Sequence, residues 1–379
     1  MKRYSDWFMG IIFMLIITLP YLFAHRNATE RVSDMENRML AAYPSIWTEE
    51  GLNQNYPSEY ETWLSDNLRG RTLMVKYNSM LQYQVFHRII KEDTLEGKNH
   101  WLFINNADMI AEYQHLNLMS EQELDDFSSG MTYLADYLND KGIAFYYFQC
   151  LDKESIYPKE YASGIYQVGE ISRADQIVNR LIREKRVPVI YPKELLLQEA
   201  KQDVIYFQYC DLEHWNEKGA YLGYAAMMNR IAEDFPQVNV LQPADYDIDE
   251  VEKLTELYGY PYPYTEIVPI YKIRNQKAVE QTENDKKRWE FLNYKEHTHY
   301  YQNPETANDL KILLVGDSFI RMFIKDDVAE GFQETLSVDW MNIPILNSVV
   351  EEYEPDIVVL ECTEASLNPI ISYIAELKK

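Results

Sequence analysis

The hydrophobic and polar positions of this chain repeat with two alternating periods, one typical of helices and one typical of buried strands. Apolar residues three and four positions apart predict amphipathic helices, and short unbroken apolar runs predict strands buried on both faces. We expect helices at residues 58–87, 121–139, 174–184, 193–201 and 217–234, another from about residue 328, and a closing helix from residue 368. We expect strands within residues 97–104 and at 143–148, 187–190, 204–207, 312–315 and 356–361. This alternation predicts an α/β fold with a mostly parallel sheet and helices on both of its faces.

The N-terminal segment differs from the rest because it is uniformly apolar. Residues 7–24 form a run of eighteen residues without a charge, and Lys2 and Arg3 precede it. That length just spans a bilayer core, and the preceding positive charges predict a cytoplasmic N-terminus. A cleaved signal peptide and a buried core helix are the alternatives, but residues 22–24 lack the small-x-small pattern of a cleavage site. We therefore expect residues 1–25 to be an uncleaved transmembrane anchor.

Two further stretches depart from the alternation. Residues 26–95 begin as a polar segment and become helical, and we interpret them as a juxtamembrane linker followed by a helical segment. Residues 242–309 lack a clear core pattern and contain the tyrosine-rich stretch 258–264, which indicates an insertion or a functional lobe. Its aromatic rings can stack on sugar rings or pack the insertion onto the body of the domain, and we favour packing. The main domain then extends over residues 96–379.

The composition describes a folded protein that does not bind nucleic acid. The 379 residues are 46% hydrophobic and 14% aromatic, enough for one large α/β domain or two smaller ones. The net charge of −25 opposes nucleic-acid binding, which needs clustered Lys and Arg, although a local basic groove remains open. The three cysteines, at positions 150, 210 and 362, lack the spacing of metal ligands. We therefore expect no metal site and interpret the cysteines as small buried side chains.

A short block that follows one predicted strand carries a candidate nucleophile. Residues 312–315 lead directly into Gly316-Asp317-Ser318-Phe319. Because ligands of a doubly wound sheet bind beyond the carboxyl ends of its strands, this block should lie at the reactive edge. Gly316 permits a tight turn with close backbone approach, and backbone N–H groups near Ser318 can stabilise an oxyanion. The alternative is structural, with Asp317 or Ser318 capping the segment that follows.

A second block, about a hundred residues earlier, supplies the partners that a nucleophilic serine needs. Asp211 and His214 follow the predicted strand at 204–207, so we expect them at the same sheet edge. Their spacing allows Asp211 to accept the Nδ1 hydrogen of His214, which leaves Nε2 free to remove the proton of Ser318. Trp215 can form a wall beside the imidazole. A satisfied structural histidine is the alternative for His214.

Together the two blocks resemble the SGNH hydrolase superfamily, in which a Gly-Asp-Ser block supplies the nucleophile and an Asp-x-x-His block supplies the base pair. Their order, with the serine block last, is similar to the branch that contains the alginate O-acetyltransferase proteins and the bacterial DHHW family. The segments that resemble motifs of this branch are residues 36–44, 66–71, 97–103, 153–158, 214–219 and 356–364. One departure is the carboxylate, which in that branch usually lies two residues before the histidine, whereas Asp211 lies three before it. Glu213 is adjacent to the histidine, and we expect it to point elsewhere.

The resemblance implies a three-layer SGNH-hydrolase-like fold and O-acetylation of a cell-surface or secreted polysaccharide. In that scheme Ser318 takes an acetyl group and passes it to a sugar hydroxyl, with His214 as base and Asp211 as its orienting carboxylate. The candidate substrate-binding residues are Asp317, Trp215, Arg321 and Lys153. For Arg321 and Lys153 an ordinary salt bridge is the alternative.

The same resemblance implies the partners of the reaction. A membrane-bound O-acyltransferase would supply the acetyl group, the polysaccharide would accept it, and no metal or diffusible cofactor is required. The single-pass anchor would hold the catalytic domain at the cell membrane, outside the cytoplasm. Two other functions remain open: a carbohydrate acetyl esterase with the same triad, and a non-catalytic polysaccharide-assembly or binding protein that keeps the fold.

Overall fold

The part of the chain that the structure describes divides into two compact units. The computed structural model describes residues 7–15, 18, 32–33, 38–48, 51–68, 70–257 and 260–377. One unit comprises Met1–Glu92 with Thr255–Pro263, and the other comprises Asp93–Leu254 with Tyr264–Lys379.

The first unit is built from short strand pairs and two helices. The strand pairs are β1 (Val32–Ser33) with β2 (Arg38–Met39), and β3 (Trp47–Thr48) with β4 (Gly51–Leu52). The single helix expected at residues 58–87 is instead two helices, α2 (Tyr56–Asn67) and α3 (Arg71–Phe86). Trp63 of α2 is buried, with its ring 4.7 Å from that of Tyr43.

The expected transmembrane anchor falls mostly on residues that are not described. Residues 7–15 are helical, whereas residues 1–6, 16–17 and 19–25 lie outside the described part of the chain. Among the described residues, none of the helices has both the length and the apolar character needed to cross a bilayer. The anchor therefore stays a prediction.

The second unit is organised around a seven-stranded sheet within the described residues, which confirms the expectation of a mostly parallel sheet. The strand order is β11-β12-β14-β13-β15-β7-β8. The parallel strands are β14 (Glu334–Asp339), β13 (Lys311–Gly316), β15 (Ile357–Cys362), β7 (Ala144–Gln149) and β8 (Val189–Ile190). Two antiparallel pairings add β12 (His299–Gln302) and β11 (Val279–Glu280) at one edge.

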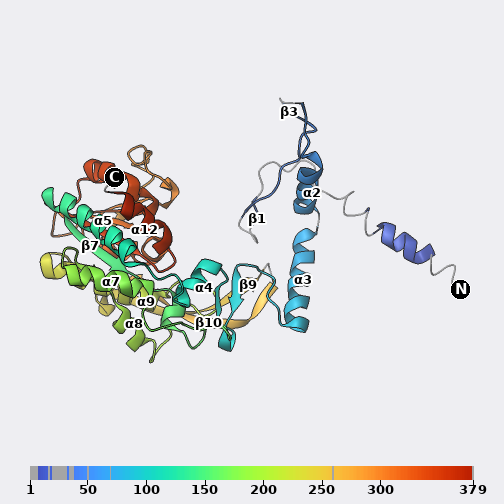
Figure 1. Cartoon of the computed structure of the whole chain (residues 1–379), viewed down its shortest axis with the longest axis horizontal. Helices are drawn as coiled ribbons and strands as arrows, with labels where there is room; N and C mark the ends of the chain where they lie inside the picture. Colours follow the sequence, from blue (N-terminus) through green and yellow to red (C-terminus); the bar gives the residue numbers. More distant parts are fainter. Residues whose placement is uncertain are drawn as a thin grey trace. The chain divides into compact units, whose positions relative to one another are not determined.

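Helices cover both faces of this sheet, so the unit has three layers. Side chains of successive strand residues point to opposite faces, and Tyr147 and Tyr146 accordingly belong to different hydrophobic cores. The helices of the Tyr147 core are α5 (Glu121–Asp140), α7 (Arg173–Glu184), α11 (Leu346–Tyr353) and α12 (Leu367–Glu376). Those of the Tyr146 core are α8 (Lys193–Glu199), α9 (Glu217–Asp234) and α10 (Lys325–Ala329). Figure 1 shows α5 and α12 side by side over the sheet.

Smaller elements complete the unit. They are β5 (Thr94–Glu96), β6 (Leu102–Ile104), α4 (Ala107–Tyr113), α6 (Lys153–Ile156) and the π-helical turn η4 (Ile320–Ile324). Residues 242–309, expected to be an insertion or a functional lobe, contain two long antiparallel strands, β9 (Tyr246–Leu257) and β10 (Tyr260–Ile273), which we call the ribbon. A two-stranded ribbon encloses no hydrophobic core of its own, so its sequence shows little of the hydrophobic pattern expected of core strands.

Two local predictions were wrong. Residues 204–207 are not a strand of the sheet, because they form only an isolated bridge in which Tyr206 pairs with Trp215. The helix expected from about residue 328 in fact ends there, since α10 stops at Ala329 and the unpredicted strand β14 follows. The pattern missed β14 because two of its buried side chains, Thr335 and Ser337, are polar.

Candidate active site

Ser318 lies where β13 ends and a helical segment begins. Residues 318–319 are helical and lead into η4. Gly316 is required by close packing, because a Cβ at this position would lie 2.5 Å from Oε2 of Glu361. The same Glu361 oxygen accepts a hydrogen bond of 2.9 Å from the N–H of Asp317. The turn that carries Ser318 is therefore fixed on the neighbouring strand, β15, as the predicted close approach requires.

Asp317 ties this turn to the loop after β15. Its Oδ2 accepts hydrogen bonds from the hydroxyls of Thr363, at 2.7 Å, and Ser366, at 2.8 Å. Its Oδ1 accepts the N–H of Phe319 at 3.0 Å, as a helix cap does. Both carboxylate oxygens are thus bound by protein donors, an arrangement that positions the turn. Its predicted role in substrate binding stays a prediction.

The three residues predicted to be catalytic meet at one place. Ser318 Oγ lies 2.7 Å from Nε2 of His214, and Nδ1 of the same ring lies 2.9 Å from both carboxylate oxygens of Asp211. Burial alone would lower the pKa of His214, but the hydrogen bond and charge of Asp211 raise it above its ordinary value. Burial would raise the pKa of Asp211, but His214 and the N–H of Glu213 lower it. An ionised Asp211 therefore fixes a basic imidazole against the serine hydroxyl.

Glu213 does not point away from this group. Its Oε1 lies 3.6 Å from Nε2 of His214, on the side of the imidazole that faces Ser318. Burial raises the pKa of Glu213 above its ordinary value. The expectation that it points elsewhere was wrong, because adjacent residues in a tight loop need not face opposite sides as they do in a strand.

Lys153 holds the catalytic loop, residues 207–214, by its backbone. It is fully buried, and its Nζ donates hydrogen bonds to the carbonyl oxygens of Phe207, at 2.8 Å, and Asp211, at 2.6 Å. Burial lowers the pKa of Lys153 to about 8. The side chain is therefore a fixed donor inside the protein. Its predicted role in substrate binding stays a prediction.

Glu266, on the ribbon strand β10, holds the same loop by its N–H groups. Its carboxylate accepts hydrogen bonds from the N–H of Gln208 at 2.7 Å, of Tyr209 at 3.1 Å and of Cys210 at 2.6 Å. Glu266 is only 4% exposed, so water competes little for these bonds. Glu266 could not be identified from the sequence, because its contacts are more than fifty residues distant in the chain and no motif marks them.

Aromatic side chains enclose the imidazole. The rings of Phe319 and Phe323 lie 5.0 and 5.3 Å from that of His214. Trp215 is fully buried and packs edge-on against Phe319 at 4.9 Å. Gly219 lets the first turn of α9 approach this group, since a Cβ there would lie 2.1 Å from the carbonyl oxygen of Ile205. Trp215 thus braces the catalytic loop from within the core, and its substrate-binding role stays a prediction.

Arg321 differs from the other three candidate substrate-binding residues because it is partly exposed and unpaired. It lies in η4, three residues after Ser318. Within the described chain its guanidinium makes no hydrogen bond or ion pair, and its Nε is buried without an acceptor. Its donors are therefore available to a ligand, and no salt bridge occupies them.

Buried carboxyls also gather at the carboxyl ends of β7 and β15. Glu364 accepts the N–H of Asp152 at 3.0 Å, and burial raises the pKa of Glu154 to about 8 and that of Glu364 to about 7. Protonated forms of these groups are populated near neutral pH. Across the described residues, no group of three or more His, Cys, Asp and Glu side chains is arranged to hold a metal ion.

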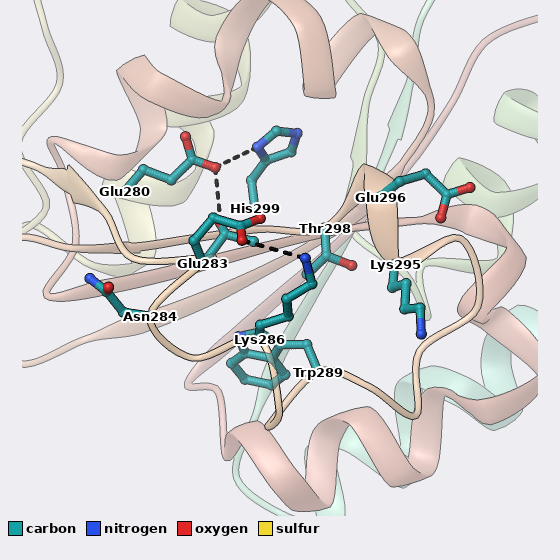
Figure 2. Close-up of a pocket in the computed structure, with 10 residues that line it drawn as sticks. Glu280, Glu283, Asn284, Lys286, Trp289, Lys295, Glu296, Thr298 and His299 are labelled. Carbon is teal, nitrogen blue, oxygen red and sulfur yellow. Dashed lines mark hydrogen bonds and ion pairs between the residues drawn. The ribbon is translucent and has the colours of Figure 1, made fainter. Parts of the chain in front are cut away.

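A pocket of about 570 Å³ lies elsewhere in the same unit, at the sheet edge formed by β11 and β12. None of the predicted site residues lines it. Figure 2 shows Glu280 beside His299, at 2.7 Å, and Glu283 beside Lys286, at 3.4 Å. Because it contains none of the residues predicted to act in catalysis or binding, this pocket is not the candidate site. We call it the edge pocket.

Comparisons with known proteins agree with the fold. The family described as SGNH hydrolase-like domain, acetyltransferase AlgX, matches residues 94–348. The structure of PatB1 from Bacillus cereus, also solved with a sulfonyl adduct, is similar with 17% identity and a TM-score of 0.53, over 72% of this chain and 96% of that chain. No curated protein matches the sequence.

Two further structures are more distant. A DHHW family protein from Eubacterium siraeum has 14% identity and a TM-score of 0.47, over 66% of this chain and 88% of that one. The O-acetyltransferase domain of Pseudomonas putida AlgJ has 14% identity and a TM-score of 0.46, over 75% of this chain and 98% of that one. Because the family match covers more than half of the chain, the resemblance seen in the motifs is confirmed. The chain belongs to the family of SGNH hydrolase-like domains described as acetyltransferase AlgX.

Proposed function

We propose that this protein is a membrane-anchored O-acetyltransferase that acts outside the cytoplasm on a cell-surface or secreted polysaccharide. The observation that carries the proposal is the unbroken contact from Ser318 Oγ through the His214 ring to Asp211. Membership of an acetyltransferase-type SGNH family supports the acyl group and the reaction class. The apolar run at residues 7–24 supports the anchor.

The first half of the reaction loads the serine. His214 Nε2 removes the hydroxyl proton of Ser318 while Oγ attacks the acetyl carbonyl of the donor. The resulting oxyanion is stabilised by backbone N–H groups around Ser318 other than those of Asp317 and Phe319, which already donate to Glu361 and Asp317. The donor's C–O bond breaks, its oxygen takes the proton from His214, and an acetyl ester of Ser318 remains.

The second half transfers the acetyl group. A sugar hydroxyl gives its proton to Nε2 of His214 and attacks the acetyl carbon, which releases Ser318 with that proton restored. Asp211 keeps the ring in the tautomer that both halves need and stabilises the imidazolium. A membrane-bound O-acyltransferase is the supplier that the anchor would keep close. With water in place of the sugar hydroxyl, the same steps give the alternative acetyl esterase.

The test is intact-mass analysis of the full-length protein in detergent after incubation with p-nitrophenyl acetate. One acetyl adduct should form, and it should be absent in Ser318→Ala and form slowly in His214→Ala. Ser372→Ala, at an exposed serine of α12, is the matched control and should retain the adduct. Loss of the adduct to added oligosaccharide indicates the transferase, and loss to water alone indicates the esterase. If no variant or wild-type protein takes up acetyl, the non-catalytic alternative replaces the proposal.

A further inference from the structure

A cleft opens between the ribbon, α9 and the segment after Ser318. Its volume is about 470 Å³, within the range of ligand-binding clefts. Phe323 lines the cleft, and the same ring lies 5.3 Å from that of His214. Ser318, His214 and Asp211 are not among the residues that line it, so Phe323 is its link to the catalytic group. We call it the acceptor cleft.

Tyrosine rings form one side of the acceptor cleft. Tyr221 of α9 and Tyr271 of β10 are stacked, with ring centroids 5.8 Å apart and an angle of 23° between their planes. Both are partly exposed, whereas Tyr246 is buried behind them with its ring 5.4 Å from that of Tyr271. A partly exposed tyrosine offers an apolar face and a polar rim together. This combination suits the apolar face and the hydroxyls of a sugar ring.

Carboxylates form much of the rest of the lining. Glu217, Asp326 and Asp327 face the cleft, and the cationic residue among its lining is Lys272. Oδ1 of Asp327 accepts the hydroxyl of Tyr246 at 2.6 Å, and burial raises the pKa of Asp327 to about 7. Oε2 of Glu217 accepts the N–H of Tyr271, which leaves its other oxygen without a protein donor among the described residues. These oxygens are acceptors, and hydroxyl and ammonium groups are the donors that complement them.

We propose that this cleft binds the acceptor, and that the acceptor is a hydroxyl-rich saccharide without carboxylates, either a neutral sugar or an amino sugar. The inference rests on the proposed function and narrows its substrate class. The cleft sets three acidic side chains against Lys272 and against Lys325, which pairs with Asp326 at 3.1 Å. Acidic groups therefore outnumber the lysines, and the carboxylates of a polyuronate would meet like charges in a partly desolvated cleft.

The experiment measures saccharide binding by calorimetry with full-length Ser318→Ala protein, in which no transfer can occur. The ligands are a neutral gluco-oligosaccharide, a glucosamine oligosaccharide and an oligouronate of equal length. We expect the glucosamine or the neutral ligand to bind and the oligouronate to bind at least about tenfold more weakly. Tighter binding of the oligouronate would overturn the charge argument.

Variants of Tyr271 locate the binding. Adding Tyr271→Leu to the Ser318→Ala protein should weaken saccharide binding by about tenfold. Adding Tyr271→Phe, which keeps the ring, should leave saccharide binding nearly unchanged. Tyr166→Leu, at a tyrosine that is 71% exposed, is the control and should change nothing. Equal binding in the Leu and Phe variants, with both melting at the same temperature, would refute the cleft as the site. Because this readout needs no chemistry, it can succeed or fail independently of acetyl uptake by Ser318.

Discussion

The edge pocket and the acceptor cleft are both acidic hollows in the same unit, yet only one has the properties of a binding site. The edge pocket is the larger, at about 570 Å³ against about 470 Å³. Glu280 is hydrogen-bonded to His299 and Glu283 pairs with Lys286, and the aromatic ring of the pocket, Trp289, is only 2% exposed. In the acceptor cleft, Asp327 and Glu217 are bound to tyrosine and backbone donors, Asp326 pairs with Lys325, and the rings of Tyr221 and Tyr271 remain partly exposed.

The difference shows that the size of a hollow is a poor guide to function. A ligand gains little from groups whose charges are already paired, since it must displace a partner before it can bind. The acceptor cleft also touches the ring of Phe323, which packs on His214, whereas the edge pocket shares no residue with the catalytic group. We therefore expect substitutions in the catalytic group and the acceptor cleft to change catalysis or binding, and substitutions in the edge pocket to change neither.

The largest effect is expected from Asp211→Asn. The amide cannot hold the Nδ1 hydrogen as a carboxylate does, so kcat/KM for acetyl uptake should fall by about 10⁴-fold. Asp249→Asn, at an exposed aspartate of the ribbon, is the matched control and should leave the rate unchanged. The measurement is p-nitrophenol release with both variants checked for unchanged thermal unfolding. A fall of less than about tenfold would mean that Asp211 is not the orienting carboxylate.

A smaller but still large effect is expected from Glu266→Gln. The amide oxygen can accept at most some of the three N–H bonds, and its NH2 group opposes the others, so the catalytic loop should lose its fixed geometry. We expect kcat to fall by about 10- to 100-fold with little change in the KM for p-nitrophenyl acetate.

The controls for Glu266 separate positioning from folding. Glu250→Gln replaces an exposed carboxylate on the same ribbon and should be silent. Glu266→Asp keeps the charge and should recover part of the rate. If instead kcat and the melting temperature fall together, and the aspartate restores neither, Glu266 serves stability alone.

The pH dependence should follow the raised pKa of His214. Only the neutral imidazole acts as a base, so kcat/KM should fall about tenfold per pH unit below that pKa. Because Asp211 raises the pKa, Asp211→Asn should move this acid limb to lower pH while lowering the plateau. An acid limb that stays in place would assign the titration to another group, and Glu213, beside Nε2, is the first to examine.

What the sequence could predict was what its local pattern encodes. The unbroken run at 312–315 and the block after it predicted a buried strand with a serine at its carboxyl end, and the short spacing of Asp211 and His214 predicted their hydrogen bond. The sequence could not predict which residues distant in the chain meet in the folded protein. Lys153 matched a motif, but nothing local indicated that its ammonium lies under the catalytic loop. Glu266 was missed because a ribbon residue meets that loop only in the folded chain.

The smallest effect, and the sharpest test of the comparison, is expected in the edge pocket. Glu283 and Lys286 are exposed and paired at 3.4 Å, and a surface pair of this kind contributes little to stability. Glu283→Gln with Lys286→Gln should therefore leave acetyl uptake, saccharide binding and thermal unfolding within about twofold or one degree of the wild type. Glu217→Gln, which removes one carboxylate from the acceptor cleft, should by contrast weaken binding of a glucosamine oligosaccharide. If the double variant weakens binding and Glu217→Gln does not, the acceptor binds in the edge pocket. It would then have to reach Ser318 and His214 by a route other than the acceptor cleft.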